Sequence, residues 1–341
     1  MVDHPFLKAC RREPAGYTPV WLMRQAGRYM KEYMEIRRKH SFLEMCRTPE
    51  IACEVTLQPI RAFDLDAAII FADILLPLEG MGIELEFAKN EGPVIRNPVR
   101  TRADIDAVRL IEPEEDVPYL LEAIRLVKKE LDGRVPLIGF AAAPFTLASY
   151  IIEGSGSRNY VNAKGLMYGD PEGWHAFMDK VSRVLSSYVE AQVEAGVDAV
   201  QIFDSWVGCL GPDDYREYVL PYTKRVIGAV EGVPVINFST NTGAYIELVA
   251  SAGGDVVGLD WRVRLGEAWR RVGHNRAVQG NLDPVVLFAP RQEIRRRVKA
   301  LLDEAEGRPG HIFNLGHGII VGTPVDNVRA LVDAVHEFSS R

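Results

Sequence analysis

The sequence has 341 residues, of which 47% are hydrophobic and 26% charged, and this balance is typical of a globular protein with a substantial core. A formal net charge of −7 argues against broad nucleic-acid binding, because that activity needs a basic face. Four cysteines without a C-x-x-C pair or a His/Cys cluster at ligand spacing favour a reduced, cytoplasmic protein that holds no metal.

Two stretches bear on the relation of the chain to membranes. Residues 1–14 lack the apolar segment of a signal peptide. Residues 135–152 contain no charged residue, and this uncharged stretch is long enough to be considered as a membrane-spanning helix. However, Pro136, Gly139 and Pro144 interrupt it. These interruptions favour a buried strand, a loop and the start of a helix, so we expect no membrane insertion.

Short apolar runs recur along the chain as strand candidates, and helical patterns separate them. The runs are residues 19–23, 65–71, 135–140, 197–203, 233–238, 255–260, 276–282 and 310–316. Between them, residues 103–133 and 175–196 repeat apolar side chains every three or four positions and end in glycine. Alternation of helices with continuously apolar strands favours a parallel sheet with right-handed crossovers.

Eight such units predict a single (β/α)8 barrel, an α/β TIM barrel, that spans residues 1–341 as one domain. An internal echo agrees with repetition, because residues 195–204 (AGVDAVQIFD) resemble residues 252–260 (AGGDVVGLD). The competing fold is an open, doubly wound sheet. That fold prefers a G-x-G-x-x-G turn after an early strand, and no such turn occurs there.

Polar side chains follow the strand candidates, where the active sites of such barrels lie. At the first of these strand ends, Arg24, Arg28 and Arg37 crowd together. They could form an ordinary solvated surface, or they could bind a strongly acidic ligand. Such a ligand would need a local positive field that overcomes the negative net charge.

Two further features each allow two interpretations. Asp73 ends a strongly apolar run, so its carboxylate either caps the following helix or faces the barrel mouth, because an unpaired buried charge is costly. The Gly-rich loop at residues 314–324 either cradles a phosphate or brings the backbone and His317 close to a bulky ligand. Residues 203–206 (FDSW) lack the G-x-S-x-G elbow of a serine hydrolase.

Several stretches together resemble the uroporphyrinogen decarboxylase family of haem biosynthesis. They are PVWLMRQAGRYMKEYMEIR, CRTPEIACEVTLQPI, AAIIFADILLP, GFAAAPFTLASYIIEG, FDSW and NLGHGI. The resemblance implies a (β/α)8 barrel that forms a homodimer and uses no metal or organic cofactor. The implied reaction converts the four acetate side chains of uroporphyrinogen III to methyl groups and gives coproporphyrinogen III and CO2.

The resemblance also implies site residues, matched position by position. The implied catalytic residues are Asp73, Arg24, Tyr150 and His317. Those implied to bind substrate are Arg24, Gln25, Arg28, Tyr33, Arg37, Phe71, Asp73, Tyr150, Phe203, Ser205 and His317. Tyr33 stands where some relatives have phenylalanine.

The implied chemistry also fits the residue types. Guanidinium groups stay charged and bind carboxylates bidentately, which suits a porphyrinogen with eight carboxylates. Asp73 would accept hydrogen bonds from pyrrole N–H groups and stabilise the cation that forms when a ring carbon is protonated. Arg24 would orient the substrate, and its role as proton donor is the weaker interpretation because arginine seldom gives up its proton.

Two rival functions are set against this one. Cobalamin-dependent methyltransferases resemble the same barrel but bind zinc through an H-x-C pair, and no histidine lies two residues before a cysteine in this sequence. A non-catalytic tetrapyrrole carrier would use the arginines for binding only. Simple binding would not require an acid such as Asp73 in the middle of an anionic ligand site.

Overall fold

The main sheet consists of seven parallel strands that follow one another in chain order. The computed structural model describes residues 4–88 and 92–340. Within them, the sheet has the order β1-β4-β5-β6-β7-β8-β9. The strands are β1 (Ala68–Ile69), β4 (Leu137–Ala142), β5 (Ala199–Asp204), β6 (Val235–Ser239), β7 (Val256–Gly258), β8 (Ala277–Gln279) and β9 (His311–Ile312). Each overlaps one predicted run, so the predicted strands from residue 65 onward are confirmed.

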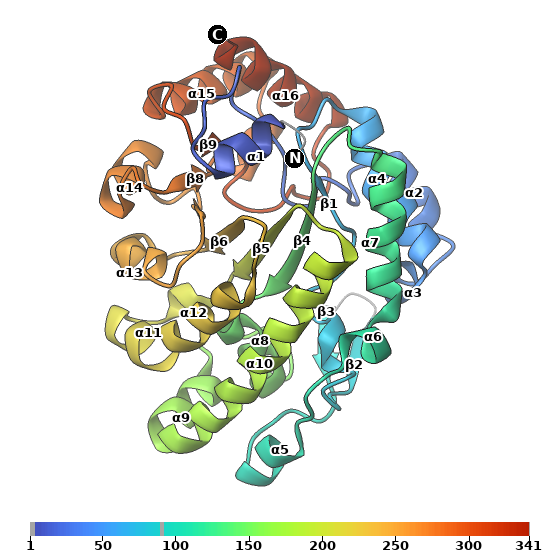
Figure 1. Ribbon diagram of the computed structural model, residues 1–341, viewed down its shortest axis with the longest axis vertical. Helices are drawn as coiled ribbons and strands as arrows, with labels where there is room; N and C mark the ends of the chain where they lie inside the picture. Colours follow the sequence, from blue (N-terminus) through green and yellow to red (C-terminus); the bar gives the residue numbers. More distant parts are fainter. Residues whose placement is uncertain (1–3, 89–91, 341) are drawn as a thin grey trace.

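Helices surround the sheet on its outer face (Figure 1). The α-helices are α1 (Pro5–Cys10), α2 (Lys31–Arg37), α3 (Phe42–Arg47), α4 (Pro49–Ala62), α5 (Arg102–Ala107), α6 (Pro113–Asp116), α7 (Pro118–Leu131), α8 (Pro144–Glu153), α9 (Val161–Gly169), α10 (Pro171–Ala195), α11 (Pro212–Tyr218), α12 (Leu220–Ala229), α13 (Ile246–Ala250), α14 (Leu265–Val272), α15 (Arg291–Glu304) and α16 (Val325–Ser339). Short 3-10 turns are η1 (Leu76–Leu78), η2 (Val207–Cys209), η3 (Gly243–Tyr245) and η4 (Pro284–Phe288).

The helical patterns are confirmed with one correction. Residues 103–133 form α5, α6 and α7 instead of a continuous helix, because Pro113 and Pro118 lack an N–H group and each begins a new helix. The uncharged stretch at 135–152 is strand β4 followed by α8, as predicted. In residues 4–88 and 92–340, no helix has the length and apolar character needed to cross a bilayer.

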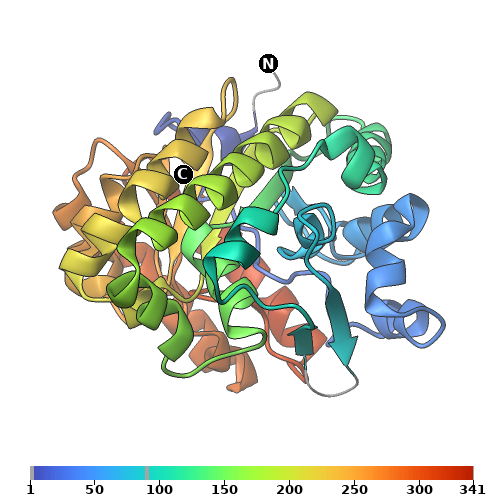
Figure 2. The ribbon, with the colours of Figure 1, turned by 90° about the horizontal axis from the view of Figure 1, so that it is seen from below.

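One element was not predicted. Strands β2 (Leu85–Ala88) and β3 (Gly92–Ile95) pair antiparallel as a separate two-stranded sheet. Figure 2 shows this hairpin standing apart from the main sheet.

The predicted first strand, residues 19–23, makes a single parallel bridge between Val20 and Phe313 instead of a full ladder. Phe313 N–H donates to Pro19 O over 2.8 Å, which joins the segment to β9. Two features shorten the pairing. Pro19 has no N–H to donate, and Arg24 turns the chain with a φ of 61°.

A pair of hydrogen bonds repeats where neighbouring strands begin. Asp198 precedes β5, and its N–H donates to Leu137 O over 2.8 Å while its Oδ2 accepts the Leu137 N–H over 2.7 Å. Asp255 precedes β7 and binds Val235 in the same two ways, at 2.9 and 2.8 Å. The internal echo of the sequence therefore corresponds to a shared aspartate clamp between adjacent parallel strands.

The same clamp joins the segment 19–23 to β1. Asp66 N–H donates to Val20 O over 2.9 Å, and Asp66 Oδ2 accepts the Val20 N–H over 2.7 Å. Residues 19–23 thus lie beside β1 as β4 lies beside β5, and they contact β9 on their other side.

Apolar side chains fill the space that the curled sheet encloses. They include Trp21, Ile138, Ala199, Ile236, Phe238, Val256, Ala277 and Ile312. A polar cross-link runs through this cluster: Trp21 Nε1 donates to Gln279 Oε1, and Gln279 Nε2 donates to Gln201 Oε1, both over 2.9 Å. Helix α1 adds Phe6 to the cluster, at the N-terminal end of the strands, which leaves the C-terminal end for a site.

The C-terminal helix α16 is tied to this arrangement through His336. His336 Nε2 lies 2.9 Å from Asp66 Oδ2, and the Tyr17 hydroxyl donates to Asp66 Oδ1 over 2.6 Å. Burial alone would lower the pKa of His336, but the hydrogen bond and charge of Asp66, together with the charge of Asp64, raise it. The contact is therefore strongest when the imidazole is protonated.

We expect His336→Gln to destabilise the protein more at pH 6 than at pH 8. Because the pKa of His336 is higher in the folded chain, the stabilisation is fully present below the unfolded value of 6.5 and is lost as the pH rises through the folded value. The loss at pH 6 should be about 1–2 kcal/mol. Urea unfolding of both proteins at each pH measures it, and an equal difference at the two pH values would contradict the assignment.

Candidate active site

Arg24 lies at the C-terminal end of the strands, directly after the segment 19–23. Its backbone is left-handed, with a φ of 61°. Its side chain lies against Gly318, where a Cβ would overlap Arg24 Cδ and Cγ. Gly318 therefore allows the Arg24 side chain to approach the loop that follows β9.

The Gly-rich loop at residues 314–324 is unsuited to a phosphate cradle, because many of its N–H groups are already used. The acceptors of the Leu315, Gly316, Gly318 and Ile319 N–H groups are, in that order, Asn314 Oδ1, Leu282 O, His317 Nδ1 and Met23 O. Of the two interpretations of this loop, the close approach of its backbone to other groups is the one that the geometry supports.

His317 is a neutral hydrogen-bond donor with a defined tautomer. The Gly318 N–H donates to His317 Nδ1 over 2.8 Å, so Nδ1 carries no proton and Nε2 carries it. Burial, followed by the charges of Arg24 and Arg262, lowers the pKa of His317 to about 4, although Asp260 opposes this shift. At neutral pH the imidazole can donate through Nε2.

Asp73 combines both of the roles that the sequence allowed. Its Oδ1 accepts the Leu75 N–H over 2.9 Å just before η1, which is a capping interaction. Its Oδ2 makes no hydrogen bond to residues 4–88 or 92–340. Burial raises the pKa of Asp73 to about 6, while the Leu75 N–H and the charge of Arg24 lower it. The group is therefore mainly a carboxylate at neutral pH, with one oxygen open to a ligand.

The charges of Asp73 and Arg24 also act on Tyr150, which lies on α8. Burial and the Asp73 carboxylate raise the pKa of Tyr150 to about 12, whereas the charge of Arg24 lowers it. The Tyr150 ring packs on Trp206 with a centroid separation of 3.8 Å. The charge of Arg24 acts on the pKa of Asp73, Tyr150 and His317, and its side chain lies against Gly318, next to His317. The four residues therefore share one electrostatic environment, and their catalytic roles stay predictions.

A second group of predicted residues lies around Tyr33 on α2. The Tyr33 ring is 5% exposed and meets Phe71 edge-on at 5.9 Å. Burial raises the pKa of Tyr33, and the charges of Arg37 and Arg28 oppose that rise. Arg37 donates from Nη1 to His40 O over 2.8 Å.

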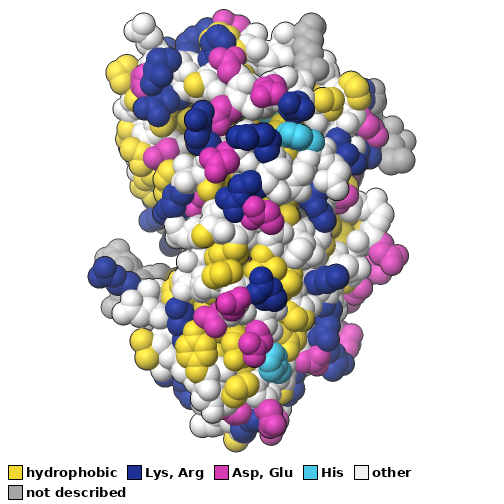
Figure 3. Space-filling view, turned by 90° about the vertical axis from the view of Figure 1, so that its left-hand side faces the viewer, with side chains coloured by type: hydrophobic (Ala, Val, Ile, Leu, Met, Phe, Trp, Pro, Cys, Tyr) yellow, Lys and Arg dark blue, Asp and Glu magenta, His cyan; other side chains and the backbone are white. Residues whose placement is uncertain are grey.

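The pairing of the arginines distinguishes the two interpretations of the basic cluster. On the face over α11 and α14, cationic and acidic side chains are interspersed (Figure 3), as on an ordinary solvated surface. By contrast, Arg24 and Arg28 are exposed and form neither an ion pair nor a hydrogen bond with the described part of the chain. Unpaired guanidinium groups beside a cluster of donors favour an anionic ligand.

Gln25 has a different environment from the one predicted. It is 1% exposed, its Oε1 accepts the Leu22 N–H, and its Nε2 donates to Ala67 O, both over 3.1 Å. Its amide therefore joins the turn before Arg24 to the strand next to it. Substrate contact by Gln25 stays a prediction.

Phe203 and Ser205 lie together at the end of β5. The Phe203 ring packs between Phe140 and Phe238, at 5.6 and 5.8 Å, and Phe238 lies 6.4 Å from the His317 ring. Phe203 therefore belongs to an aromatic layer on the enclosed side of the sheet. Ser205 is partly exposed beside Trp206.

Two strand-end residues differ from what the sequence suggested. Asp204 is 2% exposed and accepts the Thr146 hydroxyl over 2.7 Å, so it holds the first turn of α8; burial raises its pKa to about 7. Arg262 was missed, although it follows the strand candidate that ends at Asp260 and its charge reaches His317. The sequence signal that could have identified Arg262 is a cationic residue immediately after the end of a strand candidate.

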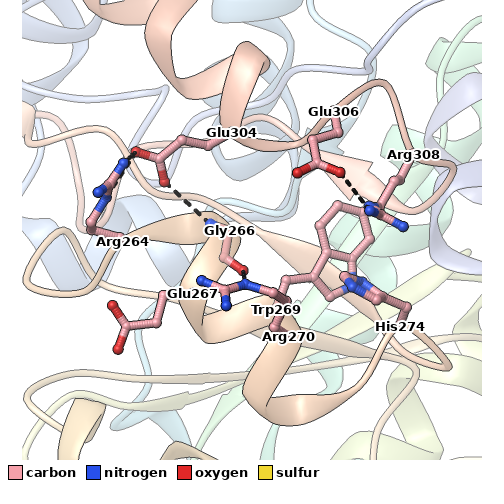
Figure 4. A pocket seen from close by; sticks show the side chains of 9 residues that line it. All are labelled: Arg264, Gly266, Glu267, Trp269, Arg270, His274, Glu304, Glu306 and Arg308. Carbon is pink, nitrogen blue, oxygen red and sulfur yellow. Dashed lines mark hydrogen bonds and ion pairs between the residues drawn. The ribbon is translucent and has the colours of Figure 1, made fainter.

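A separate cavity between α14 and α15 offers a poor alternative site (Figure 4). Its charged lining is largely self-paired, because Arg264 binds Glu304 at 3.2 Å and Arg308 binds Glu306. None of the predicted site residues lines it. Within residues 4–88 and 92–340, no group of three or more His, Cys, Asp and Glu side chains could hold a metal ion.

The family model described as uroporphyrinogen decarboxylase (URO-D) matches residues 1–338. This chain belongs to the uroporphyrinogen decarboxylase family. Proteins named uroporphyrinogen decarboxylase from Carboxydothermus hydrogenoformans and Sorangium cellulosum are 64% and 61% identical to it. The matches cover 99% and 98% of this chain and 97% and 96% of those proteins. The resemblance predicted from the sequence is confirmed.

Solved structures of other proteins agree on the fold. A methyltransferase from Methanosarcina mazei superposes with a TM-score of 0.83 at 21% identity, and the match covers 98% of each chain. A putative vitamin-B12 independent methionine synthase from Listeria monocytogenes gives a TM-score of 0.59 at 12% identity, over 95% of this chain and 97% of its own. At such identities the likeness concerns the fold alone.

Proposed function

We propose that this chain is a uroporphyrinogen decarboxylase, which converts the four acetate side chains of uroporphyrinogen III to methyl groups and releases coproporphyrinogen III and CO2. Family membership over nearly the whole chain supports this function. The single structural observation that carries it is the open oxygen of Asp73, a carboxylate set among the donors Arg24, Tyr150 and His317.

In this proposal the residues divide between binding and charge stabilisation. Arg24, Arg28 and Arg37 bind substrate carboxylates, which guanidinium groups can grip with two parallel hydrogen bonds. Tyr150 and His317 donate hydrogen bonds to acetate or propionate groups, because both carry a proton at neutral pH. The other predicted contacts are Gln25, Tyr33, Phe71, Phe203 and Ser205.

Asp73 is proposed to act on the reacting pyrrole. A proton first adds to the pyrrole α-carbon next to the ring carbon that bears the acetate, which makes the ring a cation conjugated with that carbon. The C–C bond to the carboxylate then breaks, its electron pair forms an exocyclic methylene and neutralises the cation, and CO2 leaves. A second proton adds to the exocyclic methylene and the α-carbon loses the first, so one proton is consumed for each CO2. Asp73 Oδ2 accepts pyrrole N–H groups and stabilises the cation.

The test of this function is an anaerobic incubation of the purified protein with uroporphyrinogen III, without added cofactor. Oxidation of the products and chromatography by carboxyl number should give a ladder from eight carboxylates to four. Tight binding with unchanged octacarboxylate would instead support a tetrapyrrole carrier.

We also propose that the sheet closes into a complete (β/α)8 barrel, with residues 19–23 as its first strand and residues 1–341 as one domain. Two contacts support closure. The Asp66 clamp joins Val20 to β1, and Phe313 N–H binds Pro19 O on the β9 side. Amide hydrogen exchange at Asp66 and Phe313 as slow as in β4–β5 would agree with closure, whereas rapid exchange at either would contradict it.

Finally, we propose a cytoplasmic homodimer. Exposed apolar side chains support self-association: Val285, Phe288, Ile320 and Val321 are 58%, 46%, 39% and 53% exposed on the loops after β8 and β9. Light scattering would decide this proposal, because a monomeric mass in solution contradicts it.

A further inference from the structure

Arg262 lies at the rim of the candidate site on the β7 side, whereas Arg24 follows the segment 19–23. It follows β7, and the backbone of its neighbour Trp261 packs so closely on Gly316 that a Cβ there would overlap the Trp261 nitrogen. Gly316 directly precedes His317. Burial lowers the pKa of His317, and the charges of Arg24 and Arg262 lower it further. Arg24 therefore approaches His317 from the segment 19–23, and Arg262 approaches it from β7.

The Arg262 side chain is held in one position by its own neighbours. Its guanidinium carbon lies 4.0 Å from the centroid of the Trp261 ring, and its Nη1 donates to Asp260 Oδ2 over 2.7 Å. Asp260 is itself fixed, because it is 3% exposed and its Oδ2 also accepts the Asn241 N–H over 2.8 Å. A cation held in this way loses little conformational freedom when it binds a ligand.

One edge of this guanidinium is open. Nη1 is occupied by Asp260, but Nε and Nη2 donate no hydrogen bond to residues 4–88 or 92–340. The Arg262 side chain is 44% exposed, so the Nε/Nη2 edge can be reached. The Nε/Nη2 edge presents two parallel N–H groups, and this arrangement binds a carboxylate through two hydrogen bonds.

We propose that Arg262 binds a substrate carboxylate on the β7 side of His317. This inference rests on the proposed function and extends its binding site. Arg24, Arg28 and Arg37 all come from one short segment, whereas the eight carboxylates of the substrate surround a macrocycle. Arg262 supplies a cation on another sector of the rim, so a second part of the macrocycle is held while an acetate lies near Asp73.

The alternative role of Arg262 is to neutralise the buried carboxylate of its neighbour Asp260 without touching substrate. Substitutions separate the two roles. Arg262→Lys keeps a positive charge near Asp260 but lacks the open forked edge, and Arg262→Gln removes the charge. Arg264→Gln is the matched control, because Arg264 lies in the same loop but is 76% exposed and pairs with Glu304, away from the site.

Steady-state rates with uroporphyrinogen III provide the main test. We expect Arg262→Gln to raise KM about tenfold and Arg262→Lys to raise it severalfold, because a charge-assisted contact contributes about 1.5 kcal/mol or more. The change in kcat should be smaller, and Arg264→Gln should match the unsubstituted protein. An unchanged KM in Arg262→Gln, or an equal rise in the control, would overturn the proposal. If Arg262→Gln does not fold, the KM of Arg262→Lys tests the proposal, and an unchanged KM in that variant would overturn it.

A binding measurement keeps this inference distinct from the proposed reaction. Uroporphyrin III, the oxidised octacarboxylate, cannot be turned over, and its fluorescence reports binding directly. We expect the same tenfold loss of affinity in Arg262→Gln. A protein that binds uroporphyrin but does not decarboxylate uroporphyrinogen refutes the proposed function, while the affinity ratio between Arg262→Gln and the unsubstituted protein still tests Arg262.

Discussion

Asp73→Asn is expected to reduce turnover of uroporphyrinogen III by about 10²–10³-fold while the protein stays folded. The amide keeps an oxygen that can accept the Leu75 N–H, so the cap before η1 is preserved. It carries no negative charge, however, and therefore stabilises a pyrrolic cation poorly. Rates of CO2 release by the two proteins at saturating substrate measure the effect.

The same substitution should leave the free energy of unfolding at pH 7 unchanged or higher. Burial raises the pKa of Asp73 from 3.8 to about 6 in the folded chain, so ionisation costs stability that sets in above the unfolded value and is complete above about pH 6, by up to about 3 kcal/mol. Removing the charge relieves this cost. Thermal unfolding at pH 7 checks the sign, and a large loss of stability would indicate that Asp73 is mainly structural.

The chain offers a matched control for Asp73. Asp283 Oδ1 accepts the Val285 N–H over 2.9 Å at the start of η4, the same turn that Asp73 forms before η1. We expect Asp283→Asn to leave turnover near normal. Near-normal turnover in Asp73→Asn, or an equal loss in both variants, would refute the role of Asp73.

Arg24→Gln should lower kcat/KM by about 10²-fold and change its dependence on pH. The first effect follows from loss of a charge-assisted contact to substrate, which is expected to contribute about 2–3 kcal/mol. The second follows because the charge of Arg24 lowers the pKa of Asp73, which burial has raised to about 6. Without Arg24 this pKa rises further.

The pH profile of kcat/KM separates these two effects. In the unsubstituted protein, activity should fall as the pH drops through about 6, because Asp73 becomes protonated. In Arg24→Gln the fall should begin at higher pH. Arg12→Gln is the control, because Arg12 has a similar φ of 60° and lies against Gly310 at the N-terminal end of β9. An acid limb at the same pH in Arg24→Gln would show that Arg24 does not act on Asp73.

Much of the fold could be predicted because its signals are local. An apolar run that is buried on both faces indicates a strand wherever it occurs, and the helix over 171–195 ends at Gly196, whose φ is 112°. The failures were also local in origin. Pro113 and Pro118 divide a continuous helical pattern, and the β2–β3 hairpin has no long apolar run.

The candidate site divides differently. Arg24, Asp73, Tyr150 and His317 could be named from the sequence because they stand within family motifs that follow strand candidates, although Tyr150 itself lies on α8. Their protonation states and tautomers could not be predicted from the sequence. The tautomer of His317 depends on the Gly318 N–H, and the raised pKa of Asp73 depends on its burial and on Arg24.

By itself, the sequence determined most of the strands and helices and which family the chain resembles, because periodicity and motifs are properties of neighbouring residues. Only the tertiary structure decided that Arg262, from the β7 side, and Arg24, from the segment 19–23, both act on His317. Those two arginines are far apart along the chain, and parallel strands bring distant strand ends to one rim. Charge and burial at that rim act through space, so the protonation of each group depends on partners that its own segment does not contain.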